Sequence, residues 1–431
     1  MSSPKMLLDA RASEPPVEHL PASRDRRDGG GASVRVLKPR RAAPADAVRP
    51  TRAEVNLGHL RHNLRVLERT LGPASASRPA IWAVLKADAY GHGAPAVART
   101  LERAGVAGLC VALLEEALEL REAGITAPIL VMSGYYGPRR EGLDEMVANE
   151  LVPVVYETGQ VERIASIARL RGAAASVHLK VDTGMGRLGA PERELDTLLD
   201  AVAAHPEVRI DGFMTHFACA DADDPSATRE QLRRFDVALG KARARGHAPR
   251  FVHAANSAAM LRLPETRLSL VRPGIALYGV SPFEGGEDAF ASQLKPVMRV
   301  RTEVVALREV KAGERIGYGH TWEAPRASVI ATVPMGYADG LSRALSNRGH
   351  ALVRGRRAPV VGAVSMDLTM IDVTDAAGAR LGDEVVFLGP QEGSLGKDCI
   401  TAAEIAKLTA TIPWEVLTSI SRRVPRFYRE P

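Results

Sequence analysis

The stretch IWAVLKADAYGHG, residues 81–93, contains a lysine whose position points to covalent chemistry. Lys86 follows a run of buried-type residues, at the point where the apolar character ends. Burial lowers the pKa of an amine, so a lysine at the end of a buried strand can attack a carbonyl group as a nucleophile. A simple ion pair is the alternative role, and other residues must decide between the two.

Polar side chains also follow other strand-like runs, such as SVHLKVD and FVHAANS. In chain order these residues are Lys180, Asp182, His216, Asn256, Ser257 and Arg272. Any one of them alone would more often be structural than functional. Together with Lys86 they occupy five strand ends, which indicates one shared site if those ends meet in space.

Short β-type runs and amphipathic helical runs alternate from about residue 80. IWAVLKA precedes APAVARTLERAG, and AGLCVAL precedes LEEALELREAG. Eight such repeats predict an N-terminal (β/α)8 TIM-type barrel, an α/β fold, over residues 51–285. An open doubly wound sheet would need a G-x-G-x-x-G fingerprint, which KADAYGHG lacks. Barrel active sites lie at the carboxyl ends of the strands, where the polar residues lie here.

The pattern changes after about residue 290 to β-branched strands without intervening helices. Examples are VMRVRTEVVALREV, ASVIATVPMGY and LTMIDVT, and a single helical stretch, TAAEIAKLTA, precedes the end. These runs predict a C-terminal, mostly antiparallel β domain over residues 286–431. A first strand near residues 53–58 is a candidate to pair with that domain.

The net charge of +6 comes mainly from the first 52 residues, which hold 11 of the 57 Lys and Arg but 6 of the 51 Asp and Glu. This opening segment is rich in Pro, Ala, Arg and Gly, and it cannot repay the entropy of ordering. We therefore predict a disordered basic tail over residues 1–50. We expect it to be a solvated arm, with no nucleic-acid partner.

Composition also bears on the compartment. No run of about 20 apolar residues occurs, which predicts that nothing spans a membrane. The tail lacks the apolar region of a secretory signal, and its acidic residues argue against a transit peptide. The cysteines Cys110, Cys219 and Cys399 have neither disulfide nor metal-site spacing. We expect a cytoplasmic protein without a metal site.

A phosphate site in such a barrel usually comes from the loops after strands seven and eight, where NSA and RPGIALYG lie. Ser257 supplies a hydroxyl, and Gly274 allows backbone N–H groups to approach a phosphate closely. With Lys86 as the nucleophile, these loops suggest pyridoxal 5'-phosphate as the cofactor. Arg272 would then face the pyridine nitrogen, and because a guanidinium stays protonated it would keep that nitrogen unprotonated.

The chain resembles the alanine racemases, which are fold type III pyridoxal phosphate enzymes. The matching motifs are AVLKADAYGHG, HLKVDTGMGRLG, THFACAD, HAANSAA, VRPGIALYG, IGYGHTW, VPMGYADG, VSMD and RVPRFY. The motifs stand in the order of the family, and the resemblance covers residues 54 to 428. The resemblance implies interconversion of L-alanine and D-alanine by a two-base mechanism, supplying D-alanine for peptidoglycan. It also implies a homodimer with composite active sites.

The resemblance assigns roles to individual residues. Lys86 becomes the cofactor-binding lysine and one catalytic base, and Tyr318 becomes the other base. The implied cofactor contacts are Lys86, Tyr90, His216, Asn256, Ser257, Arg272, Gly274, Ile275 and Tyr428.

The resemblance places further residues around the substrate. Arg187 and Met366 match substrate-binding residues, and Tyr337 and Asp367 border the mouth of the site. Lys180 matches a lysine that in some members is carbamylated and orients the arginine that corresponds to Arg187.

Three other kinds of protein share part of this sequence pattern. A broad-specificity or serine racemase shares most of these motifs, although tyrosines in VPMGYADG and RVPRFY imply a narrow mouth that favours alanine. A decarboxylase of the same fold type places an acid at the pyridine nitrogen, whereas VRPG offers an arginine. A non-catalytic cofactor-binding barrel would have no reason to keep the second domain or Tyr318.

Overall fold

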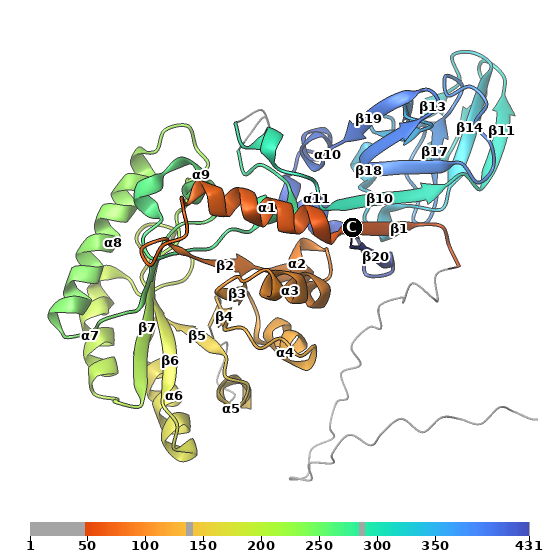
Figure 1. The fold of residues 1–431 in the computed structure, drawn as a ribbon. Coiled ribbons are helices and arrows are strands. Elements are labelled where there is room, and N and C mark those ends of the chain that lie inside the picture. The colour runs from red at the N-terminus through yellow and green to blue at the C-terminus, as the bar shows by residue number, and fades with distance from the viewer. Residues whose placement is uncertain (1–47, 135–140, 284–288, 431) are drawn as a thin grey trace, which may run out of the picture. The chain divides into compact units, whose positions relative to one another are not determined.

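A computed structural model describes residues 48–134, 141–283 and 289–430 (Figure 1). The tail predicted over residues 1–50 therefore lies outside the described residues, except for its last three positions.

Eight parallel strands form the predicted barrel. They are β2 (Ala80–Val84), β3 (Gly108–Val111), β4 (Ile129–Val131), β5 (Val152–Val155), β6 (Ala175–Lys180), β7 (Val208–Met214), β8 (Phe251–His253) and β9 (Leu270–Val271). Each strand from β2 to β7 pairs with the next along the chain, and β9 pairs with β2. Backbone hydrogen bonds from Ser269 N to Val252 O and from Arg272 N to Ala255 O link the segments around β8 and β9. The barrel prediction is confirmed.

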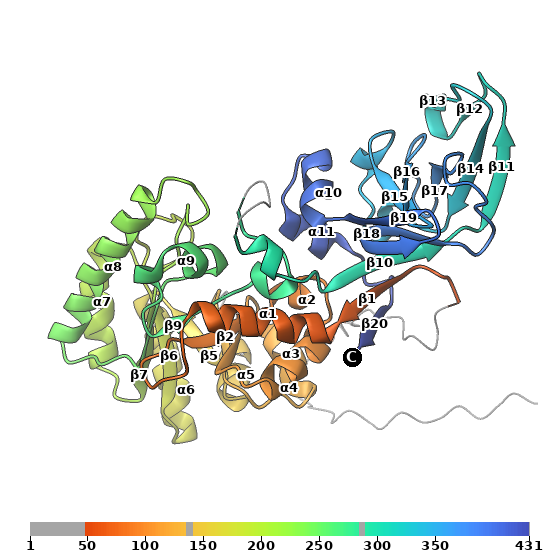
Figure 2. The same ribbon diagram turned by 45° about the horizontal axis from the view of Figure 1, so that its top comes forward.

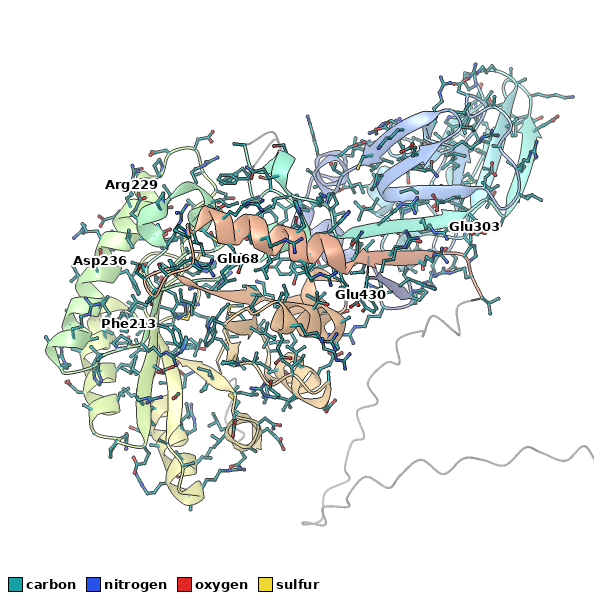
Figure 3. All side chains as sticks on the ribbon, viewed as in Figure 1. Glu68, Phe213, Arg229, Asp236, Glu303 and Glu430 are labelled. Carbon is teal, nitrogen blue, oxygen red and sulfur yellow. The ribbon has the colours of Figure 1, made fainter. Side chains whose placement is uncertain are left out.

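Helices connect the strands and pack on their outer side (Figures 1 and 2). They are α3 (Ala94–Arg103), α4 (Leu114–Glu122), α5 (Glu141–Ala148), α6 (Thr158–Arg171), α7 (Glu192–Ala203), α8 (Ser226–Ala244) and α9 (Ser257–Arg262). Phe213 of β7 is labelled in Figure 3. It packs on Phe235 of α8, with ring centroids 5.5 Å apart. Helix α1 (Leu57–Thr70) precedes β2, and the Asn56 side chain caps it by accepting from His59 N.

Two glycines make room for unusually large residues inside the barrel. A Cβ on Gly108 would lie 2.6 Å from the Trp82 ring, and one on Gly212 would lie 2.3 Å from the His178 ring. The two rings contact each other, with centroids 5.3 Å apart. Aromatic and imidazole rings therefore fill positions that branched aliphatic residues usually fill in such barrels.

The second domain is built mainly from antiparallel strands. Its largest sheet contains β1 (Arg52–Asn56), β10 (Met298–Glu303), β15 (His350–Val353), β16 (Arg356–Pro359), β18 (Glu384–Gly393), β19 (Gly396–Ile400) and β20 (Arg426–Arg429). The smaller sheets contain β11 (Ala306–Val310), β14 (Ser328–Val333) and β17 (Thr369–Asp372), and β12 (Arg315–Ile316) and β13 (Trp322–Glu323). Strand β1 lies between β10, to which it is antiparallel, and β20, to which it is parallel. The sheet thus uses both ends of the described chain.

Two helices occur near the C-terminus, where the sequence predicted only one. The predicted stretch forms α10 (Ala402–Thr409), and α11 (Pro413–Ser419) follows it. Helix α11 has only seven residues and begins at a proline, so it is too short to show a helical period in the sequence. No helix in the described part of the chain is long and apolar enough to cross a bilayer.

Burial of His92 generates a prediction about acid stability. Its side chain is fully buried, Nδ1 donates to the carbonyl oxygens of Ala89 and Tyr90, and burial lowers its pKa to about 4. Between about pH 6.5 and pH 4 the unfolded state binds a proton that the folded state does not. The free energy of unfolding should therefore fall as the pH drops, with His92 contributing up to about 1.4 kcal/mol per pH unit.

Urea unfolding of wild type and His92→Gln across this pH range would test the prediction. In the variant, the free energy of unfolding should depend less steeply on pH, by about one bound proton. Equal slopes for wild type and His92→Gln would contradict it.

Candidate active site

A pocket of about 180 Å³ lies at the carboxyl ends of the barrel strands. Its walls are Val84, Lys86, Tyr90, Met132, His216, Asp221, Asn256, Ser257, Ala258, Arg272, Gly274, Ile275, Pro282 and Trp414. The structure thus brings together eight of the residues that the sequence singled out for the cofactor. These residues come from four strand ends that are far apart in the sequence.

Lys86 lies two residues after the end of β2, where the polypeptide leaves the barrel interior. Burial lowers the pKa of its amine, Arg187 lowers it further, and Glu116 opposes both effects. A lowered pKa increases the fraction of the neutral amine, which is the form that attacks a carbonyl carbon.

The residues after Lys86 form a left-handed turn. Ala87, Asp88, Ala89 and Tyr90 have φ values of 52°, 57°, 53° and 53°. This conformation costs roughly 1–2 kcal/mol per residue for side chains other than glycine. Side chains hold the turn by hydrogen bonds, because Ala87 N donates to Glu116 Oε1 at 2.6 Å and Ala94 N donates to Asp88 Oδ1 at 2.7 Å. The turn ends with Tyr90 in the pocket wall.

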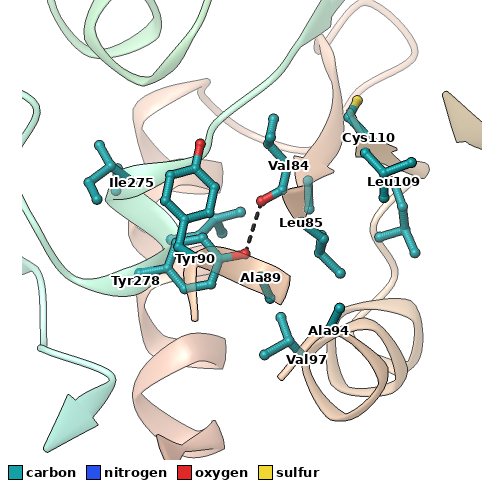
Figure 4. Packing of buried hydrophobic residues seen from close by; sticks show 14 of the residues in the cluster. Val84, Leu85, Ala89, Tyr90, Ala94, Val97, Leu109, Cys110, Ile275 and Tyr278 are labelled. Carbon is teal, nitrogen blue, oxygen red and sulfur yellow. Dashed lines mark hydrogen bonds between the residues drawn. The ribbon is translucent and has the colours of Figure 1, made fainter. Parts of the chain in front are cut away.

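Tyr90 is fixed by stacking and by close approach of the backbone. Its ring stacks on Tyr278 at 4.7 Å, and Tyr278 Oη donates to Val84 O at 2.9 Å (Figure 4). Only a glycine fits opposite its hydroxyl, since a Cβ on Gly274 would lie 2.3 Å from Tyr90 Oη. Burial raises the pKa of Tyr90, so its hydroxyl remains a neutral donor.

Ser257 lies beside this backbone segment. Its Oγ accepts from Gly274 N at 2.8 Å and from Ala276 N at 3.4 Å. The hydroxyl hydrogen of Ser257, the phenol of Tyr90 and the backbone around Gly274 therefore converge on one end of the pocket. Converging neutral donors of this kind suit a phosphate group.

Arg272 also lines the pocket and is almost fully buried. Its Nη1 donates to His253 Nδ1 at 2.6 Å, and its Nη2 donates to the carbonyl oxygens of Thr215 and Ala254. Within the described part of the chain no carboxylate pairs with it. Burial lowers its pKa to about 10, so the guanidinium remains charged at neutral pH.

The hydrogen bond from Arg272 fixes the protons of two buried histidines. Because a guanidinium only donates, His253 Nδ1 must accept, and its proton lies on Nε2. His253 Nε2 then donates to His178 Nδ1 at 2.9 Å, which places the proton of His178 on its own Nε2. Burial lowers the pKa of His178 to about 3 and that of His253 well below its usual value, so both rings stay neutral.

Cations dominate the rest of the site. The pKa of Lys180 is lowered to about 8 by burial and by nearby Arg272 and Arg187, although Asp182 acts to raise it. The pKa of His216 lies well below its usual value, because it is buried and Arg272 is close. The Asp182 carboxylate is occupied with the backbone N–H groups of residues 184–186. The pocket is thus prepared for an anionic ligand.

Comparison with known proteins gives the family. The model of the alanine racemase N-terminal domain matches residues 55–282, and that of the alanine racemase C-terminal domain matches residues 297–428. The chain belongs to the alanine racemase family. An alanine racemase of Sorangium cellulosum is 69% identical over 385 residues, which cover 89% of this chain and 100% of the relative.

Solved structures of family members share the fold. The alanine racemase of Streptomyces coelicolor has a TM-score of 0.82 and 37% identity, covering 89% of this chain and 99% of the other. A structure of the Bartonella henselae enzyme with covalently bound pyridoxal phosphate has a TM-score of 0.77 and 30% identity, covering 88% and 99%.

Seven residues that the alanine racemase resemblance assigned to the site do not line this pocket. They are Lys180, Arg187, Tyr318, Tyr337, Met366, Asp367 and Tyr428. Tyr318 is 73% exposed on a turn of the second domain, and Met366 is 53% exposed. Tyr428 lies on β20 beside Val55, where it is partly exposed. Arg187 is exposed on the loop after β6 and acts on Lys86 through its charge.

Sequence reasoning missed several residues of the site. Trp414 of α11 lines the pocket, but nothing in the sequence places a residue of the second domain against Lys86. Glu116 holds the left-handed turn, and the only signal for it was a glutamate at the start of a helix. His178 and His253 stood inside motifs that the sequence analysis quoted, at strand positions that point into the barrel.

Substituting Glu116 should loosen the segment that carries Lys86. Its carboxylate accepts from Ala87 N at 2.6 Å, Ala112 N at 2.8 Å and Leu113 N at 3.1 Å. Glu116→Ala should lower the free energy of unfolding by about 1–3 kcal/mol and speed amide hydrogen exchange in residues 85–93. Glu116→Gln, which keeps one acceptor oxygen, should have a smaller effect.

Glu115→Ala is the matched control, because Glu115 is exposed on the same helix turn. Hydrogen exchange and urea unfolding on the three variants would measure these effects. If Glu115→Ala and Glu116→Ala behave alike, Glu116 does not hold the turn.

Proposed function

We propose that this chain interconverts L-alanine and D-alanine with pyridoxal 5'-phosphate bound to Lys86, and that it thereby supplies D-alanine for peptidoglycan. Membership of the alanine racemase family makes it an isomerase. The observation that carries the proposal is the pocket itself, in which a lysine of lowered pKa faces a buried arginine that has only neutral acceptors.

The residues present fit this cofactor. Tyr90, Ser257 and the backbone at Gly274 would hold its phosphate, and Lys86 would bind its aldehyde. A Cβ at position 274 would collide with the Tyr90 hydroxyl, which supports a site where backbone and ligand approach closely. When bound, the cofactor supplies an electron-withdrawing ring that acidifies the hydrogen on the α-carbon of an amino acid.

Arg272 sets the electronic character of the site in this proposal. Its hydrogen-bond partners are the imidazoles of His253 and His216 and two backbone carbonyls, so its charge is not cancelled by a carboxylate. With the cofactor bound, Arg272 would be a permanent donor toward the pyridine nitrogen, would keep that nitrogen unprotonated and would disfavour reactions that need a stronger electron sink, such as decarboxylation.

Lys86 and Tyr318 would move the protons. Lys86 Nζ, with its lowered pKa, takes or returns a proton on one face of the substrate α-carbon. Tyr318 Oη does the same on the opposite face, so removal by one base and return by the other inverts the configuration. Arg187 would bind the substrate carboxylate together with the backbone of Met366.

Lys180 would support Arg187. Its pKa of about 8 leaves part of the amine neutral near pH 7, and a neutral amine is the form that adds carbon dioxide. A carbamate at this position would supply the negative charge that the surrounding cations lack. We propose this modification for Lys180 on that basis.

The site is proposed to be completed by a second copy of the chain. Tyr318, Met366 and Tyr337 are exposed and do not line the Lys86 pocket of their own chain. Two bases that flank one α-carbon must lie within a few Å of the cofactor. In a two-fold homodimer, each second domain can reach the barrel of the other copy. Such a dimer has two sites, and each site contains one Lys86 and one Tyr318.

Mixing two inactive variants tests the shared site. Lys86→Ala and Tyr318→Ala should each lower kcat by at least about a thousandfold, because each removes one of the two bases. After subunit exchange, one of the two sites in each heterodimer would regain both residues, and activity should rise toward half of the wild-type value per heterodimer. Native mass spectrometry would confirm the exchange, and verified heterodimers without activity would show that the two bases act within one chain.

Racemisation of a panel of L-amino acids, followed by chiral chromatography, tests the substrate. Alanine should turn over fastest, with serine and lysine slower, because the pocket is small. Faster turnover of serine would support the alternative of a serine or broad-specificity racemase. Release of carbon dioxide without inversion would support a decarboxylase.

A further inference from the structure

A carboxylate buried in the second domain joins three distant parts of the chain. Asp339 is 0% exposed, and both its oxygens are fully used. Arg49 forms a bidentate pair with it, with Nη1 at 3.0 Å from Oδ2 and Nη2 at 2.7 Å from Oδ1. Arg423 Nε donates to Oδ1 at 2.7 Å, and Gly336 N donates to Oδ2 at 3.0 Å.

The turn that contains Asp339 carries Tyr337. The backbone N–H groups of Tyr337 and Ala338 donate to the carbonyl oxygens of Ser365 and Met366, both at 3.0 Å. Contact is so close that a Cβ on Gly336 would lie 2.3 Å from Ser365 O. The Tyr337 turn and the Met366 loop are therefore joined through their backbones, and Asp339 anchors the turn.

Arg423 is shared between two carboxylates. Its Nε binds buried Asp339, while its Nη2 donates to exposed Asp367 at 2.6 Å. A buried charge is costly unless it is paired, whereas an exposed ion pair contributes little. If Asp339 lost its other arginine, Arg423 would turn toward it and release Asp367.

We propose that Arg49 is a positioning residue for the mouth of the active site. By pairing with Asp339 through both of its terminal nitrogens, it leaves Arg423 free to hold Asp367 and the adjoining Met366. Arg49 lies ahead of residue 55, where the match to the family model begins, so the extension in front of the barrel takes part in shaping the site. The inference deepens the proposed function, because Tyr337 and Met366 matter only if they complete a site.

The charges around Asp339 are consistent with this role. Burial alone would raise the pKa of Asp339, but hydrogen bonds from Arg423, Arg49 and Gly336 N hold it below its usual range. The carboxylate therefore stays ionised at neutral pH and needs both arginines. Arg52, three residues after Arg49, pairs with Glu54 instead and does not touch Asp339.

Steady-state kinetics and hydrogen exchange on full-length Arg49→Ala would test the proposal. The KM for alanine should rise about fivefold with kcat changed by less than about twofold, as expected for loss of one exposed contact at the mouth. Amide exchange should speed up in residues 336–340 and 364–368 but not in the barrel strands. Arg49→Lys should recover part of the effect, and Arg52→Ala should resemble wild type.

A double-substitution cycle separates positioning from general destabilisation. If Arg49 acts by keeping Arg423 on Asp367, then Arg49→Ala should not raise KM further in an Asp367→Asn background. Additive effects of the two substitutions on KM would overturn the proposal. Amide hydrogen exchange that speeds up uniformly across the Arg49→Ala chain would also overturn it, as would exchange that does not speed up at all.

Two truncations sharpen the assignment. A chain that begins at Arg49, after the initiator methionine, should keep the wild-type KM and exchange pattern, whereas one that begins at Pro50 should reproduce Arg49→Ala. The exchange measurement does not depend on catalysis. A wild-type protein without racemase activity would therefore refute the proposed function, and hydrogen exchange would still decide whether Arg49 holds the 364–368 segment.

Discussion

The buried positive charge of Arg272 is the constraint on which the site depends. A guanidinium in a barrel interior would ordinarily be paired with a carboxylate, yet here its partners are two neutral histidines and backbone carbonyls. Burial lowers the pKa values of Lys180, His216 and His253, and the charge of Arg272 lowers them further. Arg272 also constrains the residues of the barrel core. His253 donates to His178 Nδ1, so His178 must be neutral as well. The His178 ring in turn leaves room only for a glycine at position 212.

The left-handed turn after Lys86 is a second feature of the site that is unfavourable in free energy. Four consecutive residues with positive φ are unfavourable, and the surrounding structure holds them through Glu116, Asp88 and the stacked tyrosines. Without this turn, the residues after Lys86 would follow a right-handed path, and Tyr90 would lie on a different side of the chain. Strain of this kind persists only where neighbouring contacts determine the backbone completely.

Sequence reasoning predicted the parts that follow from periodicity and from strand ends. Alternating strands and helices gave the barrel, and polar residues such as Lys86, His216 and Arg272 lie together in one pocket because parallel strands end on one side. It could not find Trp414, since that contact depends on how a seven-residue helix packs on the barrel. Likewise Tyr428, whose motif matched, pairs beside Val55 and does not line the pocket, because motif matching does not give side-chain direction.

The place of β1 in the second sheet bears on how the chain is synthesised and folded. Ala53 pairs with Val300 on one side and with Arg426 on the other, so residues separated by almost the whole described chain become neighbours. During translation the barrel can close once its last strand has emerged, whereas the sheet must wait for the final residues. Until then β1 presents an unpaired edge, on the side that β20 later covers, and such an edge invites association with other chains. A fragment that starts after the barrel would lack an interior strand, so the two family domains are not independent folding units.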